Sequence, residues 1–189
     1  MPITTGGGAK LEVEQAPPLI VSSYVPGSTR PFRSNRFPVW RIPCVDDLSY
    51  YKGLQSVWDD PFVLVNVEHD CLVDDDIVQS LLDCKFKMCT VAHSLFWPST
   101  HRPEPQYAQR HNPPANCKRE NLYLGTPIER GQEWCDFTAI GCCKMHPEVR
   151  VGALAESHWS HVDISVTAAC SGRWHVHWLA DGREIHDHY

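Results

Sequence analysis

The sequence predicts an α/β domain with a central, mostly parallel sheet flanked by helices. Residues 62–67 (FVLVNV) are nearly all apolar, which is typical of a strand in the middle of a parallel sheet. Residues 48–58 precede that strand with helical spacing, and residues 77–84 follow it with acidic residues at their start. A β-branched run over 19–24 adds an earlier strand. Strands that alternate with helices in this way favour a single α/β domain over residues 18–189.

The composition supports one globular domain. The chain has 189 residues, of which 42% are hydrophobic and 21% are charged, so it can bury a core and is neither wholly disordered nor fibrous. Seventeen Lys and Arg against 23 Asp and Glu give a net charge of −6 without a basic block, which disfavours sequence-independent binding to a nucleic-acid backbone. The longest apolar run is too short to span a bilayer, so no membrane span is predicted.

Further elements follow from turn residues and periodicity. We expect an additional strand over 39–42, with Asp46 or Asp47 capping the helix that follows it. Three more segments are predicted in the C-terminal half: a strand over 137–140, a helix over 164–169 and a strand over 174–178. Gly141 is expected in a tight turn.

Two stretches are predicted to lack regular structure. Residues 1–17 contain three consecutive glycines and end at a Pro-Pro pair, which indicates a flexible lead-in. Residues 97–134 contain six prolines and no clear periodicity. A loop of that length in a compact domain is usually functional or mobile.

The nine cysteines are interpreted as mostly reduced, buried and apolar, because no secretory signal precedes them. This predicts a cytoplasmic protein. Cys84 and Cys89 are five positions apart and Cys142 and Cys143 are adjacent, so neither pair has the Cys-x2-Cys spacing of common zinc sites. A structural zinc site is therefore not favoured.

The segment Glu68-His69-Asp70 directly follows the predicted strand 62–67. Open α/β sheets bind ligands at the carboxyl ends of their strands. Two carboxylates at i and i+2 of an extended segment point the same way and repel each other unless a cation lies between them. A divalent ion that Asp70 binds and that bridges to a diphosphate would remove this repulsion. The alternative is a solvated turn that leads into the next helix.

The chain ends in a histidine-rich segment. His175, His177, His186 and His188 lie in the last fifteen residues. Imidazole together with carboxylate suits Mn²⁺, or Zn²⁺ when more nitrogens take part. Terminal tails normally fray, so an ordered histidine-rich end would indicate that something holds it.

Three strings together resemble a known family: VNVEHDCLVDDDIVQSLLDC, FTAIGCCKM and WSHVDISVTAACSGRWHVHW. A strand that ends in Glu-x-Asp, a later Asp that opens a helix, and a late His look like a compact glycosyltransferase of the GT-A type. The resemblance is to small family-2-like enzymes of bacteria and their phages, and it covers residues 19–188. It implies a single GT-A-like, Rossmann-like domain.

The resemblance also implies residue roles. Asp70 and His186 would bind the metal, with His188 as the competitor of His186, and Glu68 would contact the metal-bound water or the ribose. Asp163 would be the general base of an inverting enzyme. The remaining positions are implied to bind the nucleotide (Ser22, Ser23, Tyr24, Asp46, Asp47) or to line the acceptor and sugar pocket (Gly141, Trp159, His177).

The predicted function is therefore transfer of a sugar from a nucleotide-diphosphate sugar to an acceptor hydroxyl with Mn²⁺ or Mg²⁺ as cofactor. A protein, a glycan, a lipid and a modified DNA base all stay open as acceptors. One alternative is a catalytically silent protein of the same fold with a binding or structural role. Another is a zinc-dependent hydrolase built on the histidine-rich end, but no His-Glu-x-x-His motif supports it. The structural alternative for Asp163 is a helix N-cap.

Overall fold

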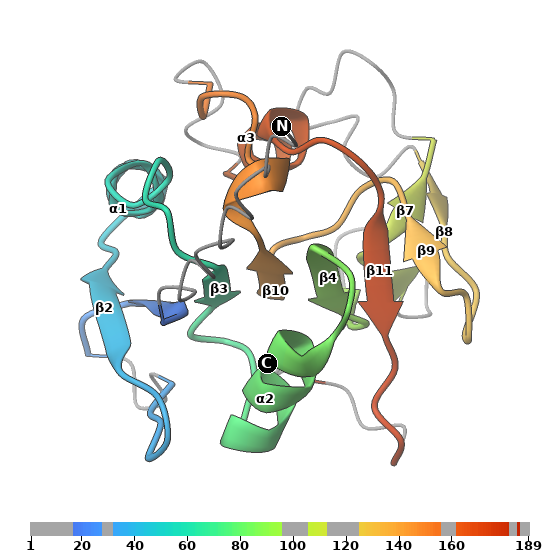
Figure 1. The fold of residues 1–189 in the computed structure, drawn as a ribbon, viewed down its shortest axis with the longest axis horizontal. Helices are drawn as coiled ribbons and strands as arrows, with labels where there is room; N and C mark the ends of the chain where they lie inside the picture. Colours follow the sequence, from blue (N-terminus) through green and yellow to red (C-terminus); the bar gives the residue numbers. More distant parts are fainter. Residues whose placement is uncertain are drawn as a thin grey trace, which may run out of the picture.

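A computed structural model describes residues 17–27, 32–95, 106–112, 125–155, 162–181 and 185. Its centre is a seven-stranded sheet in the order β2-β1-β3-β10-β4-β11-β9 (Figure 1). The strands are β1 (Leu19–Tyr24), β2 (Val39–Pro43), β3 (Leu64–Val67), β4 (Met88–Val91), β9 (Trp134–Cys135), β10 (Cys142–Met145) and β11 (Trp174–His177). The helices are α1 (Asp47–Gln55), α2 (Asp75–Asp83) and α3 (Val162–Ala169), with a short 3-10 helix, η2 (Pro147–Val149).

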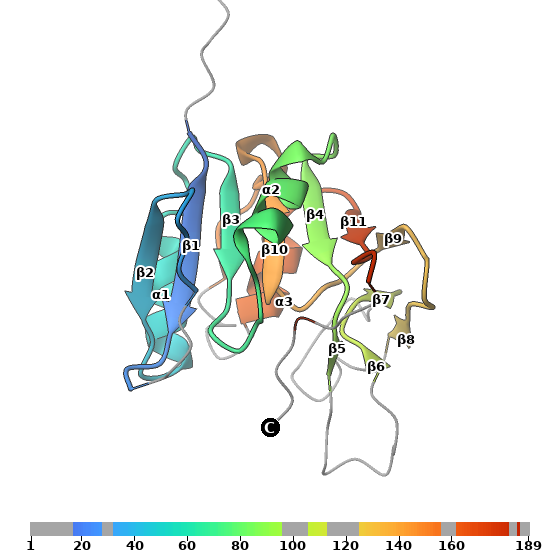
Figure 2. The same ribbon diagram turned by 90° about the horizontal axis from the view of Figure 1, so that it is seen from below.

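The sheet is mixed, and this corrects the expectation of a mostly parallel one. β1 pairs in parallel with β2 and β3, and β4 pairs in parallel with β11. β10 lies between β3 and β4 and is antiparallel to both, while β9 is antiparallel to β11. The arrowheads of β1, β2, β3 and β4 lie at the same edge in Figure 2. β10 starts at that edge, because the carbonyl of Gly141 accepts a 2.8 Å hydrogen bond from the N–H of Glu68, just after β3 ends.

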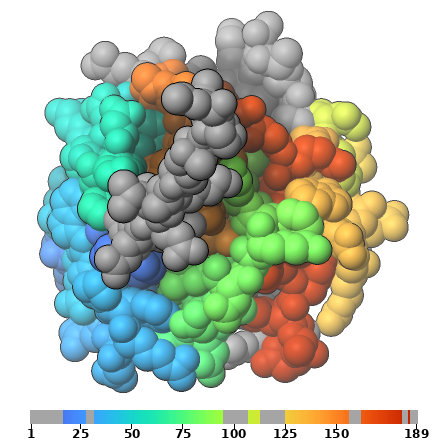
Figure 3. Space-filling model, viewed as in Figure 1, coloured from blue at the N-terminus to red at the C-terminus, as the bar shows by residue number. Residues whose placement is uncertain are grey.

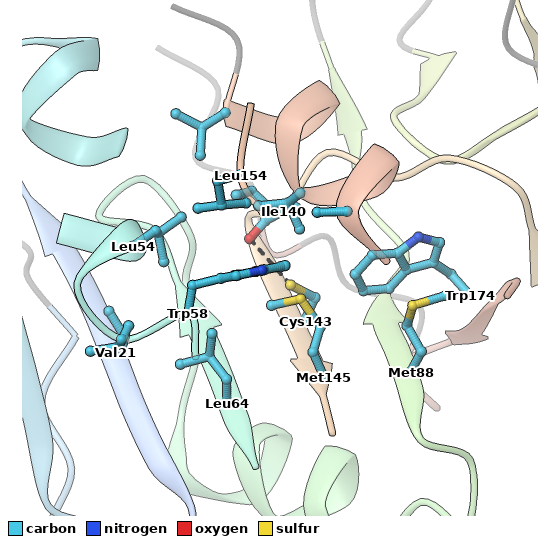
Figure 4. Packing of buried hydrophobic residues seen from close by; sticks show 14 of the residues in the cluster. Val21, Leu54, Trp58, Leu64, Met88, Ile140, Cys143, Met145, Leu154 and Trp174 are labelled. Carbon is cyan, nitrogen blue, oxygen red and sulfur yellow. Dashed lines mark hydrogen bonds between the residues drawn. The ribbon is translucent and has the colours of Figure 1, made fainter. Parts of the chain in front are cut away.

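Helices cover both faces of the sheet, as Figures 1 and 2 show together: α1 and α3 on one face, α2 on the other. Alternate strand residues therefore belong to two different cores. The core under α1 and α3 includes Val21, Leu64, Met145, Trp58 and Trp174 (Figure 4). The core under α2 includes Ile20, Val65, Val78, Leu81 and Ile185. The sheet with helices on both faces confirms an α/β architecture.

Aspartates cap both predicted N-terminal helices. Asp46 is the N-cap of α1, where its Oδ1 accepts from the N–H of Ser49 at 2.7 Å in a capping box. Asp74 caps α2 by accepting from the N–H of Ile77 at 2.9 Å. Both predicted helices are confirmed with shifted bounds: α1 covers 47–55 instead of 48–58, and α2 covers 75–83 instead of 77–84.

The predicted strand over 137–140 is wrong. Phe137 forms only an isolated bridge with Arg110, and the central strand is β10, which starts after Gly141. The backbone groups of Phe137 bond to Arg110 instead of to the sheet. Two small two-stranded sheets complete the described structure: β5 (Ser94–Leu95) with β6 (Gln106–Tyr107), and β7 (Arg110–His111) with β8 (Thr126–Pro127).

The predicted flexible segment 1–17 lies outside the described residues except for its last position. Most of 97–134 is also outside them, but its described parts carry the short strands β6, β7, β8 and β9. Within the ranges that the structure describes, no helix is long and apolar enough to cross a membrane.

Candidate functional site: carboxylates at the edge of the sheet

Acidic side chains from three elements gather where the parallel strands end. Glu68 and Asp70 directly follow β3, Asp47 opens α1 after β2, and Asp163 lies in the first turn of α3. α1 and α3 cover the same face of the sheet, and the Tyr51 hydroxyl of α1 donates to the carbonyl of Leu154, before α3, at 2.9 Å. Residues that are far apart in the sequence therefore share one corner of the molecule.

Glu68 is the most perturbed of these carboxylates. Its pKa is raised from 4.5 to about 8, first by burial and then by the nearby negative charges of Asp163 and Asp70. A hydrogen bond from the Tyr50 side chain partly offsets this rise. The group is therefore largely protonated at neutral pH until a positive charge enters the site.

Tyr50 and Asn66 support Glu68 from the sheet side. The Asn66 side-chain amide donates to the Tyr50 hydroxyl at 3.0 Å and to the carbonyl of Ile140 at 2.7 Å. Because the Tyr50 oxygen accepts from Asn66, its own hydrogen can be donated to Glu68. Burial and the Glu68 charge raise the pKa of Tyr50, so the hydroxyl stays protonated as a donor.

Asp163 has a pKa raised from 3.8 to about 6. Burial is the main cause, and the charges of Asp47 and Asp70 add to it, while a backbone hydrogen bond opposes them. A carboxylate with a pKa close to neutrality is well matched to accepting a proton during a reaction. The alternative interpretation as an N-cap is wrong, because α3 begins one residue earlier, at Val162.

Gly141 lies just before β10 and against the segment that carries Glu68 and Asp70. A Cβ atom at this position would lie 2.8 Å from the Cys71 Sγ and 3.4 Å from the His93 Nε2. Cys71 in turn lies beside Asp70, with 3.9 Å between its Sγ and the Asp70 Oδ1. Only glycine lets the start of β10 approach the Glu68–Asp70 segment this closely, which is a reason for glycine other than the predicted tight turn.

In the structure, the charges of Asp163 and Asp70 raise the pKa of Glu68, and those of Asp47 and Asp70 raise the pKa of Asp163. The sequence assigned these four residues to separate roles in metal binding, base catalysis and nucleotide binding. Tyr24 ends β1 at the same edge, where its carbonyl accepts from the N–H of Cys44 at 2.7 Å. His186 and Trp159 lie outside the described residues.

Other predicted residues have different surroundings. Ser22 and Ser23 are buried within β1, and in the described part of the chain the Ser22 hydroxyl has no hydrogen-bond partner. Asp46 is exposed, and its carboxylate caps α1. His177 lies on β11 in a group with Cys84, Cys89 and His175, on the face that α2 covers.

That Cys/His group was missed by sequence reasoning. Its ligand atoms all lie within 4.8 Å of one another. Cys84 and Cys89 have an unusual spacing, and the two histidines follow about ninety residues later, so only the pairing of β4 with β11 unites them. The His-x-His alternation on a predicted strand was the available signal, because it places both rings on one face.

The carboxylates suit a hard divalent cation only in part. Among the described residues, the Cys/His group is the one set of three or more potential ligands that is compact enough to hold an ion by itself. Mg²⁺ and comparable cations commonly use one or two carboxylates together with substrate phosphates, rather than an all-protein cage. Glu68 and Asp70 fit that arrangement, since burial and the charges of Asp163 and Asp70 raise the pKa of Glu68, and a cation would relieve this.

Comparison with protein-family models finds no match for this chain, and a search of curated proteins finds none either. The fold class and the site therefore rest on the sequence and the structure alone.

Proposed function

We propose that this protein is a metal-dependent glycosyltransferase that transfers a sugar from a nucleotide-diphosphate donor to an acceptor hydroxyl. The observation that supports the proposal is that Glu68 and Asp70, which follow β3, lie close enough to Asp163 in α3 for the charges of Asp163 and Asp70 to raise the pKa of Glu68. These are the three acidic positions that the resemblance to GT-A-type enzymes singles out for cation binding and base catalysis.

The backbone near the chain end also supports the proposal. The carbonyl of Ile185 accepts a hydrogen bond from the N–H of Leu72, two residues after Asp70. Ile185 is fully buried in the core under α2. It immediately precedes His186, the implied second protein ligand of the cation. Ile185 thus lies beside the segment that carries Asp70, and His186 is the next residue in the sequence.

Asp70, with Glu68 beside it, would hold a Mn²⁺ or Mg²⁺ ion that neutralises charge on the departing nucleoside diphosphate. Asp163 would accept the proton of the acceptor hydroxyl as that oxygen attacks the anomeric carbon of the sugar. The Tyr50 hydroxyl would hold Glu68 in place, and the raised pKa of Glu68 would return to its ordinary range when the cation binds.

A panel of nucleotide sugars and nucleoside diphosphates tests the proposal by thermal shift, with Mn²⁺, Mg²⁺ or no divalent cation. We expect at least one nucleotide to raise the Tm only when a cation is present, because a ligand that binds the native state stabilises it. Asp70→Asn should abolish that shift, while Asp83→Asn, on the exposed end of α2, should keep it. Release of nucleoside diphosphate from the selected donor then measures turnover.

Binding without turnover by any donor or acceptor tested would favour the catalytically silent alternative. No shift with any nucleotide, or equal shifts in the parent protein and Asp70→Asn, would contradict the proposal.

A further inference from the structure

Four potential metal ligands meet on the face of the sheet that α2 covers, away from α1 and α3. Cys84 is the C-cap of α2, Cys89 lies in β4, and His175 and His177 lie in β11. Cys89 is directly opposite His175 in the parallel pairing of β4 with β11. In Figure 3 the green surface of α2 and the segment after it borders the red surface formed by residues after 170.

The distances within the group are short. The two sulfur atoms lie 2.9 Å apart, and the Cys84 Sγ lies 3.7 Å from the His175 Nδ1. The rings of His175 and His177 are edge to face with 5.0 Å between their centroids. One ligand atom from each residue lies within 4.8 Å of the ligand atoms of the other three. An ion with ligand bonds of about 2.0–2.3 Å would reach all four after small side-chain movements.

His177 has an unmet bonding requirement. Its Nε2 is buried and has no hydrogen-bond partner among the residues that the structure describes. A buried polar nitrogen without a partner costs stability, and a metal bond would satisfy it.

Lys144 supplies a positive charge beside the two sulfurs. It is fully buried in β10, and its ammonium donates to the carbonyl of Cys84 at 2.7 Å. It also contacts the Cys89 thiol through a hydrogen bond. The Lys144 side chain therefore lies directly against the Cys/His group.

We propose that Cys84, Cys89, His175 and His177 form a structural Zn²⁺ site. Two soft sulfurs and two imidazole nitrogens in a compact group are the ligand set of closed, tetrahedral zinc sites. Binding displaces one proton from each thiol, so Zn²⁺ and two neutral cysteines give a neutral Zn(Cys)₂(His)₂ unit and two released protons. With four protein ligands, no position stays open for substrate.

The site would tie the end of α2 and the turn after it to β11, near the edge of the sheet. In this assignment His177 binds zinc and does not line the acceptor pocket that the sequence predicted for it. The site is independent of the proposed sugar transfer, which depends on carboxylates and a harder cation.

The first experiment measures metal in the full chain, purified without chelators, by inductively coupled plasma mass spectrometry. We expect close to one zinc per chain. Replacing zinc by Co²⁺ should give the visible d–d bands of a tetrahedral ion and a near-ultraviolet sulfur-to-cobalt band. A chelator should remove the metal and lower the Tm by roughly 5 °C or more. Less than a tenth of an equivalent of zinc after zinc addition would overturn the proposal.

Variants separate metal binding from packing. Cys89→Ala and His177→Gln should each reduce bound zinc at least tenfold under competition with a chelator. Cys142→Ala is the matched control, because Cys142 is an equally buried free thiol in the core under α2 but outside the group. If Cys89→Ala fails to fold, two measurements still test the proposal: the zinc content of His177→Gln, whose replaced side chain is partly exposed, and the cobalt spectrum of the parent protein. Normal zinc content in both ligand variants, or a Cys84–Cys89 disulfide that persists in reductant, would contradict the proposal.

Discussion

The two clusters of this protein differ in how their chemistry is assembled. The carboxylate cluster comprises Glu68, Asp70, Asp163 and Asp47, lies where the parallel strands end, and offers oxygen atoms that repel one another. The Cys/His group lies against a sheet face and offers sulfur and nitrogen atoms compact enough to enclose an ion. An open set of hard ligands suits a cation shared with substrate, whereas a closed set of soft ligands suits a structural ion.

The largest effect is expected at Asp163. Asp163→Asn removes the base but keeps the shape of the side chain, so we expect the turnover rate to fall by roughly 10²–10⁴-fold. Nucleotide affinity should change little, since the proposed role begins only when the acceptor loses its proton. Initial rates of sugar transfer and a binding titration with the nucleoside diphosphate, on the same preparations, measure the two quantities.

If Asp163 is the base, sugar transfer by the parent protein should also decrease as the pH falls through about 6, because the base must be ionised and the pKa of Asp163 is about 6. A rate that is unaffected by Asp163→Asn, or a variant with equal losses in affinity and rate, would remove Asp163 from the role of base.

The pH dependence of stability probes Glu68. Its pKa is raised from 4.5 to about 8, so the native state holds a proton that the unfolded chain has released. Stability therefore falls as the pH rises through this window. The lowered pKa of His177 adds an opposite trend near pH 6.5, where a histidine of the unfolded chain is still half protonated, but this trend is the same in the parent and in Glu68→Gln and cancels in their difference. We expect Glu68→Gln to flatten this fall and to be more stable than the parent at pH 8 by about 1–3 kcal/mol.

Urea unfolding at pH 6.5, 7.25 and 8 measures this difference. Mn²⁺ should reduce the fall in the parent, because the cation replaces the proton. The same pH slope in Glu68→Gln and in the parent would show that Glu68 is not the perturbed group.

Gly141 links the carboxylate segment to β10. Gly141→Ala places a Cβ 2.8 Å from the Cys71 Sγ, so we expect a loss of stability of about 1–3 kcal/mol. In the double variant with Cys71→Ala most of that loss should be recovered, since the clashing sulfur is gone. The free energies of unfolding of the two single variants and the double variant give the coupling energy between positions 71 and 141. If the losses of the single variants simply add up in the double variant, the contact with the Cys71 sulfur is not the cause of the loss.

The smallest effect is expected at Asp46. Asp46→Ala removes the cap of α1 and should lower the Tm by a few degrees, whereas Asp46→Asn keeps an accepting oxygen for the Ser49 N–H. Nucleotide affinity of Asp46→Asn then decides the predicted binding role. Parent-like affinity would leave Asp46 as a cap only, and weaker affinity with an unchanged Tm would support contact with the nucleotide.

The sequence predicted those features that local chemistry determines. The predicted bounds of β1 agree with the structure. Asp46 was one of the two predicted caps of α1, and the acidic run before α2 was predicted to start that helix, because capping and acidic residues lie beside the helix they start. Glu68 and Asp70 were identified because they follow an apolar strand without interruption. Local order along the chain was therefore enough to find the acidic end of β3.

Features that depend on long-range pairing were not predictable in the same way. The antiparallel insertion of β10 between β3 and β4 has no signal in its own four residues, Cys142–Met145. The Cys/His group depends on β11 pairing beside β4, and its cysteine spacing matches no common zinc pattern. The surroundings of the buried Lys144 were likewise not predictable, because its contact with Cys84 joins residues that are far apart in the sequence.

The most direct test of the central claim is a calorimetric titration of the matched nucleoside diphosphate with and without Mn²⁺, using zinc-loaded parent protein and Asp70→Asn. We expect Mn²⁺ to tighten binding to the parent at least tenfold and to leave binding to Asp70→Asn unchanged. Binding that is independent of Mn²⁺ in the parent, or that tightens equally in both proteins, would contradict a cation shared by Asp70 and the diphosphate.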